Sequence, residues 1–295
     1  FNVNWQIDSM TNLAAWAGVY PFWQKQDNTT RMGQTEYMPM PVDYSYCDTS
    51  TANPFWGGGY VGAWFEHRYD TTGRKLSLTL NGSGWLSRSV GSTNRHFANP
   101  AFTDMRRANR TMDTEPSISL GINYTLPLKH GFELEAGADI EGEFGRGYDY
   151  LDTLNAATGL YEQIGLRSYD TRSNHLDLEE YVTALKRWGN FTAKVGLRME
   201  ECLSRVECSH ADDGPTMRLD TAFMEVVPSL HLSYRTDNFH NFSLNYTRRH
   251  SHPTVTSLID FREYDDNDFS TGNPALAFSY THNIEAAWSK FYMGW

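Results

Sequence analysis

Apolar and polar residues alternate one by one along many short stretches of this chain, and this period of two limits its fold more than any other feature. In the clearest stretch, residues 117–126, Ile118, Leu120 and Ile122 fall on one face while serine, glycine and asparagine fall on the other. Successive side chains of a β-strand point to opposite faces of the sheet. The pattern therefore indicates strands with one apolar and one polar face, in agreement with a negative mean hydropathy despite 14% aromatic residues.

The same alternation predicts about eleven strands along the chain. No run of residues approaches the ~18 consecutive apolar positions that a membrane helix needs, so a helical membrane protein is excluded. A membrane barrel is not excluded, because its strands carry apolar side chains only at every second position. The expected strands are residues 1–7, 12–20, 60–69, 76–81, 117–126, 132–141, 175–187, 191–200, 229–234, 242–246 and 278–288.

Short and long links alternate between these strands. An up-and-down meander then places every tight turn at one end of the sheet and every long loop at the other, as outer-membrane barrels do with their periplasmic turns and external loops. A soluble sandwich has no reason to sort its loops in this way. The short links are residues 8–11, 70–73, 129–131, 187–190 and 236–238, and the long ones are 21–57, 84–114, 145–174, 201–221 and 249–275.

Aromatic residues near the short links support the membrane interpretation. Tyr124, Phe132, Phe191 and Tyr234 fall on the apolar faces within a few residues of a tight turn. Barrels carry such girdles where the bilayer meets water. Several strands also reach the ~9 to 11 residues that a tilted membrane strand requires.

Three motifs follow one another in the second half of the chain. The first is YVTALKRWGNFTAKVGLRME at residues 181–200, which ends in a Gly-Leu-Arg signature. The second is VPSLHLSYRTDNFHNFSLNYTRRHSHP at 227–253, and the third is TGNPALAFSYTHNIE at 271–285. In this order the motifs resemble the outer-membrane β-barrel family of TonB-dependent receptor-like proteins common in the Bacteroidota. His252 stands where the family usually has Arg, and Phe278 where it usually has Pro.

The signature positions carried over by this resemblance are expected to be structural. Arg198 falls on the inward face, where it could pair with carboxylates of the lumen or of a plug domain. The full set is Gly196, Leu197, Arg198, Pro228, Ser229, Arg248, Arg249, Pro253, Gly272, Asn273 and Pro274.

The resemblance implies a barrel of about twenty-two strands filled by an N-terminal plug. We therefore expect residues 1–295 to be part of one outer-membrane β-barrel domain, a fragment without the plug and the final strands. The chain also starts at Phe1 with no signal peptide. The implied function is uptake of a scarce or bulky nutrient or metal complex across the outer membrane of a Gram-negative bacterium, with lipid and the TonB complex as partners. The alternatives are a barrel without a plug that serves as adhesin, assembly factor or scaffold, and a soluble all-β binding protein.

No catalytic motif or cofactor site emerges from the sequence, so we expect neither an enzyme nor a cofactor. Ser83 lacks the context of a nucleophile elbow, and Gly142, Gly145 and Gly147 are spaced to let a strand bend into a loop. The net charge of -11 argues against a nucleic-acid partner. The inward carboxylates Glu133, Glu135, Asp139, Glu141 and Glu143 suit a wet lumen wall.

Two loop features leave alternatives open. The run from Asp265 to Asp268 could bind calcium through its oxygen atoms or be a solvated acidic loop. Cys202 and Cys208 fall in one predicted external loop, where a disulfide is feasible but not required, and Cys47 would stay unpaired.

Overall fold

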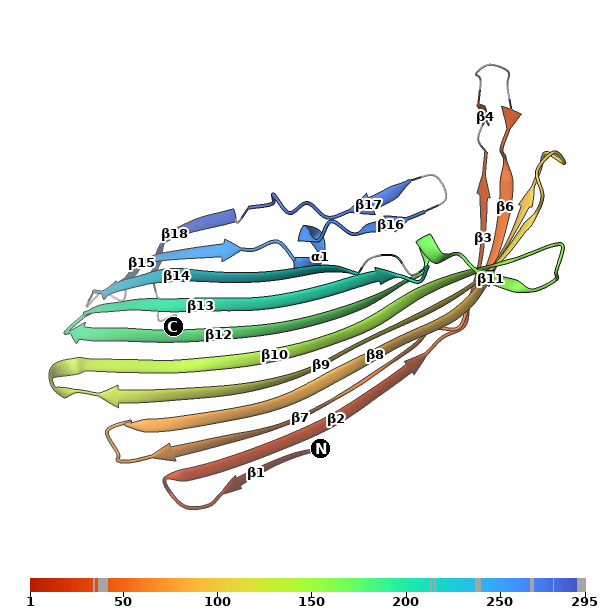
Figure 1. Cartoon of the computed structure of the whole chain (residues 1–295). Helices are drawn as coiled ribbons and strands as arrows, with labels where there is room; N and C mark the ends of the chain where they lie inside the picture. The colour runs from red at the N-terminus through yellow and green to blue at the C-terminus, as the bar shows by residue number, and fades with distance from the viewer. Residues whose placement is uncertain are drawn as a thin grey trace, which may run out of the picture.

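The computed structural model describes residues 1–33, 35–36, 42–212, 214, 216–236, 240–265, 268–277 and 279–290. The chain forms a large, curved antiparallel sheet (Figure 1). Eleven strands follow one another across it in chain order. They are β1 (Asn2–Gln6), β2 (Thr11–Trp23), β7 (Phe55–Arg68), β8 (Lys75–Phe97), β9 (Met105–Pro127), β10 (Phe132–Leu154), β12 (Tyr169–Trp188), β13 (Phe191–His210), β14 (Met217–Arg235), β15 (His240–Ser251) and β18 (Ser279–Lys290).

Each of these strands contains or overlaps one expected from the alternation, so the fold class and the up-and-down order are confirmed. The tight turns between β1 and β2, β7 and β8, β9 and β10, and β12 and β13 gather at one end of the sheet (Figure 1). Gly73, Gly131 and Gly189 occupy positive φ in three of them, a backbone conformation that other residues rarely adopt. The turn expected at 236–238 lies largely outside the described residues.

The predicted long loops are wrong over much of their length, because four of the five, all but 249–275, are mainly strand. β8, β9 and β10 each run for 23 residues and include most of 84–114 and the first ten residues of 145–174. A bilayer needs only ~9 to 11 residues of strand, and beyond it both faces meet water, so the apolar alternation stops while the ladder continues. Gly142, Gly145 and Gly147 accordingly lie inside β10 and mark no bend into a loop.

The outer end of the sheet carries further short elements. β3 (Gln26–Met32) pairs with β6 (Tyr46–Ala52), which also pairs with the outer part of β8. Residues 26–52 thus include a hairpin that rises beyond the main wall (Figure 1). The remaining elements are β4 (Thr35–Glu36), β5 (Val42–Asp43), η1 (Lys129–Gly131), β11 (Tyr161–Gln163), η2 (Gly165–Arg167), α1 (Val255–Leu258), β16 (Arg262–Tyr264) and β17 (Phe269–Thr271).

The two faces of the sheet differ as the alternation predicts. Ile118, Leu120 and Ile122 expose 55%, 49% and 44% of their surface on one face. On the other face, side chains meet across an intervening strand: Lys194 Nζ of β13 lies 3.3 Å from Glu135 Oε2 of β10, with β12 between them. Curvature brings side chains together on a concave face, so the polar face is the inner one. The described residues include no second sheet packed over the apolar face, which excludes a soluble sandwich.

The link from β15 to β18 folds back onto the inner face. Ile259 and Phe261 pack against Val206 and Cys208 of β13, and all four side chains are buried. The guanidinium of Arg167, the last residue of η2, pairs with Asp265 at 2.6 Å. Residues 252–265 and 268–277, which we name the inward loop, are therefore held to the outer half of the inner wall.

Candidate functional site

A hollow of about 440 Å³ lies on the inner face of β10, β12, β13 and β14, beside the end of β15. Its lining includes Asp139, Glu179, Tyr181, Arg198 and Arg248. Strand alternation places the first four of these side chains inward, and the register of the ladders places Tyr181 directly opposite Arg198. The hollow therefore follows from strand pairing as much as from the sequence of any one strand.

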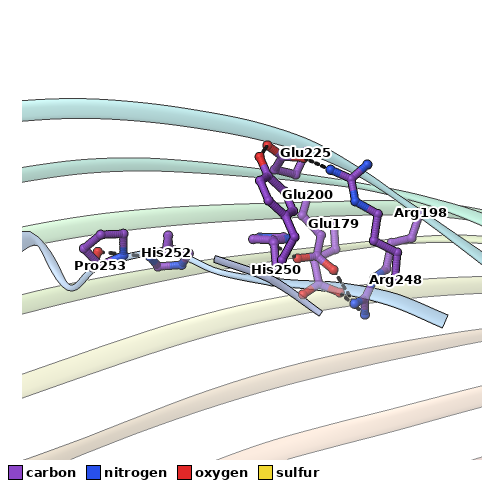
Figure 2. A network of polar contacts seen from close by, with 9 residues as sticks. Glu179, Arg198, Glu200, Glu225, Arg248, His250, His252 and Pro253 are labelled. Carbon is purple, nitrogen blue, oxygen red and sulfur yellow. Dashed lines mark hydrogen bonds and ion pairs between the residues drawn. The ribbon is translucent and has the colours of Figure 1, made fainter. Parts of the chain in front are cut away.

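Arg198 is at the centre of the ion pairs in this hollow. Its Nη1 lies 3.3 Å from Glu179 Oε2 on the neighbouring strand, and its Nη2 also contacts Glu200 (Figure 2). Two different nitrogens of one planar guanidinium thus contact two carboxylates. The single ammonium group of lysine cannot reproduce this geometry. The Arg198 and Glu179 side chains remain 44% exposed, so the pair faces a wet space and contributes little to stability.

A second set of contacts depends on where β15 leaves the sheet. The β14–β15 ladder ends at the pair Ser229–Thr247. Arg235 donates its N–H to Asn190 on the β13 side. Alternate residues of an antiparallel strand donate to the same side, so Pro228 turns its nitrogen toward β15, where it has no proton to give. The ladder cannot continue, and the rest of β15 swings over the inner face.

Polar contacts with the wall hold the end of β15 that has left the sheet. Arg248 Nη2 lies 3.6 Å from Glu225 Oε2, and His250 Nε2 lies 3.3 Å from Glu200 Oε2 (Figure 2). The Tyr280 hydroxyl donates to Glu225 Oε1 at 2.6 Å, and the Arg248 guanidinium stacks over the Tyr280 ring at 4.5 Å. Glu200 therefore joins Arg198 of the wall to His250 of β15.

The structure brings six of the expected signature positions to this one hollow. Gly196, Leu197, Arg198, Ser229, Arg248 and Arg249 all line it. Pro228 lies at its edge, where it ends the ladder as described above. These six positions come from the first two motifs, and Tyr280 of the third motif contacts Glu225 and Arg248.

Gly272, Asn273, Pro274 and Pro253 lie elsewhere, in the inward loop. A Cβ built on Gly272 would overlap the carbonyl oxygen of Ile259, and the Gly272 N–H donates to that oxygen at 3.1 Å. Asn273 donates its N–H to the Ser257 carbonyl at 2.7 Å and accepts the Ala275 N–H at 2.9 Å. These signature residues close the loop upon itself.

Sequence reasoning missed the acidic partners of the network. Glu179, Glu200 and Glu225 lie on strands β12, β13 and β14 at inward positions, but only the register shows that they meet the arginines. His250 was also missed, because its inward position depends on the departure of β15 from the sheet. Alternation is enough to place the glutamates on the inner face, but nothing in the sequence shows which arginine each of them contacts.

The structure decides the open question on the disulfide, whereas the calcium prediction lies partly outside the described residues. Among the described residues no group of three or more His, Cys, Asp or Glu side chains could hold a metal ion, and Asp266 and Asn267 lie outside them. Cys202 and Cys208 are not in a loop but in β13, and neither is in a disulfide. Six residues along a strand separate them by ~20 Å, far beyond the reach of a disulfide.

The model of the outer membrane protein beta-barrel family matches residues 67–294. The chain belongs to this family. It is an antiparallel β-barrel protein of the outer membrane, so the apolar outer face of the wall meets lipid and the network around Arg198 faces the lumen. No helix within the described residues has the length and apolar character to cross a bilayer.

Three solved receptors are similar to the chain in fold. The unliganded ferric citrate transporter FecA matches at 12% identity and a TM-score of 0.44, over 84% of this chain and 40% of that one. The ferric-catecholate import receptor Fiu from E. coli K12 matches at 9% identity and a TM-score of 0.44, over 84% of this chain and 48% of that one. The ferric yersiniabactin uptake receptor FyuA from Yersinia pestis matches at 10% identity and a TM-score of 0.42, over 99% of this chain and 49% of that one. The chain spans less than half the length of each. The outer membrane protease OmpT from Escherichia coli also matches, at 9% identity and a TM-score of 0.33. No curated protein matches the sequence.

Proposed function

We propose that the chain is the barrel portion of a TonB-dependent receptor-like protein of the Bacteroidota type, which takes up a scarce or bulky nutrient or metal complex. The observation that carries the proposal is the ion-pair network of the signature residues. Arg198 and Arg248 meet Glu179, Glu200 and Glu225 on the lumen side. Such a charged wall suits water and a polar plug domain better than an apolar solute.

The remaining partners follow from this proposal. A plug and the TonB-contacting segment would belong to a part of the protein outside residues 1–295, and further strands would pair with the free edges of β1 and β18. The ligand would enter between the outer extensions of β8, β9 and β10. We propose no enzymatic activity, no cofactor and no nucleic-acid partner.

Conductance of the complete protein in a planar lipid bilayer tests the proposal. A plugged receptor stays silent until urea unfolds the plug and then opens a large pore that closes when urea is removed. In parallel, photo-crosslinking should join the complete protein to the periplasmic domain of TonB. A barrel that conducts at once and forms no crosslink would instead be the alternative, an adhesin, assembly or scaffold protein without a plug.

A further inference from the structure

The inner face of β2 and β7 departs from the polar pattern of the rest of the lumen wall. At three successive inward positions on these two strands, an aromatic residue of one strand is opposite a glycine of the other. The pairs are Trp16–Gly62, Tyr60–Gly18 and Tyr20–Gly58, and the row continues outward with Phe22 opposite Trp56. We name this row of rings the aromatic track.

The rings of the track lie flat on the sheet. A Cβ built on Gly18 would lie 2.5 to 2.7 Å from three atoms of the Tyr60 ring and hydroxyl, so the ring occupies the space above that glycine. A Cβ on Gly62 would likewise overlap the Trp16 indole. Tyr60 and Tyr20 expose 48% and 55% of their surface. The Trp16, Tyr20 and Tyr60 rings therefore each cover a glycine and leave one π face toward the lumen. The Phe22 and Trp56 rings stack on each other, with centroids 5.5 Å apart.

A polar column runs beside the track on β8 and β9. The Ser83 and Ser117 hydroxyls are 2.7 Å apart, and Asn81 Nδ2 donates to Ser119 Oγ at 3.3 Å. Farther out on the same two strands, Trp85 Nε1 donates to Glu115 Oε2 at 3.1 Å. Stacking surfaces and hydrogen-bonding groups therefore lie side by side along the wall.

The charge of this part of the wall limits the class of ligand that it can bind. None of its inward positions, all of which the structure describes, is Lys, Arg or His. These positions are the even residues of 12–22 and 56–66 and the odd residues of 77–87 and 113–123. Asp113 and Glu115 are acidic members near the outer end. Glu66, at the opposite end, is already paired with Arg68 and Lys75, which lie just beyond this part of the wall. An anionic ligand would meet repulsion and no cation there. A neutral ligand with apolar faces and a polar rim suits the site.

We propose that the aromatic track binds a neutral oligosaccharide. A pyranose ring presents C–H groups on its faces, which stack on an aromatic π face, and hydroxyls on its rim, which reach serine and asparagine side chains. Side chains on the inner face recur every two residues, about 7 Å along the strand, so the track is long enough to hold several sugar units in succession. Binding is independent of the proposed function, whereas carriage of the bound sugar into the cell would rest on it.

Calorimetric titration of the complete protein, purified in a detergent without a sugar headgroup, tests the inference. The probes are glucose-, mannose-, xylose- and N-acetylglucosamine-based oligosaccharides, a sulfated oligosaccharide and choline. We expect at least one neutral oligosaccharide to bind, and Tyr60→Ala to weaken that binding about tenfold or more. The matched control is Val61→Ala, the next residue of β7, which lies on the outer face with 60% of its surface exposed and should bind as the parent does.

Three results would overturn the inference. They are no binding of any neutral oligosaccharide, equal affinity of the parent and Tyr60→Ala, or preference for the sulfated probe or choline. None of them bears on conductance or crosslinking to TonB, so failure of the sugar site remains distinct from failure of the proposed function.

Discussion

The Tyr181 hydroxyl of β12 donates a hydrogen bond to Asn123 Oδ1 of β9, two strands away. The bond passes over Gly137 of β10, which the register places between the two residues. A Cβ on Gly137 would lie 2.5 Å from the Asn123 oxygen and 2.7 Å from the Ile122 carbonyl oxygen. The glycine is therefore required for three strands to share one polar contact on the lumen side.

Substitution of this glycine should destabilise the barrel. Gly137→Ala forces the Tyr181 ring or the β9 backbone to move, and overpacking of this kind costs about 1 to 3 kcal/mol. The urea midpoint of the heat-modifiable folded form should fall. Gly82→Ala is the matched control, because its Cβ would meet Val61 at an ordinary 3.5 Å. Equal midpoints for the two variants would contradict the contact.

The two faces of the wall should respond differently to a new charge. Ile122→Arg places a guanidinium in lipid near the bilayer midplane, at a cost of ~2 to 4 kcal/mol. Thr79 on β8 is opposite Gly121, the residue before Ile122, but its side chain faces the lumen near Asp139. Thr79→Arg should therefore cost little. The measurement is the folded fraction after refolding into lipid vesicles. Similar losses for both variants would disprove the assignment of the faces.

The inward loop should detach from the wall when the close approach of Gly272 to the Ile259 and Ser257 carbonyl groups is blocked. Gly272→Ala introduces a methyl group where the Ile259 and Ser257 carbonyls already lie, with no room to yield. Trypsin added to intact cells should then cleave after Arg262 at least about fivefold faster, because local opening controls proteolysis. Ser270→Ala, an exposed change in β17, should leave the rate unaltered. An unchanged rate for Gly272→Ala would show that the loop is not held as described.

The turn between β7 and β8 supplies a pH-dependent contribution outside the membrane. Hydrogen bonds from the Thr72 hydroxyl and N–H lower the pKa of Asp70 below its ordinary value near 3.8. A lowered folded-state pKa means that the stabilisation is complete above pH ~4 and is lost as the pH falls through the folded-state pKa. The difference in unfolding midpoint between the parent and Asp70→Asn should therefore be largest at neutral pH and shrink in acid. A constant difference would exclude this contribution.

The alternation in the sequence predicted the parts of the strands that contact lipid. It did not predict their extensions beyond the bilayer. Ile118 to Leu126 alternate because one face is in hydrocarbon, whereas Leu86 to Phe97 show no such pattern and were assigned to a loop although they continue β8. The same limit applies to the hollow. Arg198 was expected to face carboxylates, but Glu179 and Glu200 were not identified, since partners on other strands depend on register. His250 depends on a ladder that ends at Pro228, which alternation does not show.

Labelling of single cysteines in intact cells tests most directly that this sheet is a barrel wall with its long extensions outside. Cys47, Cys202 and Cys208 are first replaced by serine in the complete protein. A membrane-impermeant maleimide should label Ala157→Cys, in the exposed turn after β10, and should label Lys129→Cys, beside the β9–β10 turn, only after the outer membrane is permeabilised. Labelling of Lys129→Cys and sparing of Ala157→Cys in intact cells would contradict the orientation. Equal labelling of both without permeabilisation would contradict the membrane barrel itself.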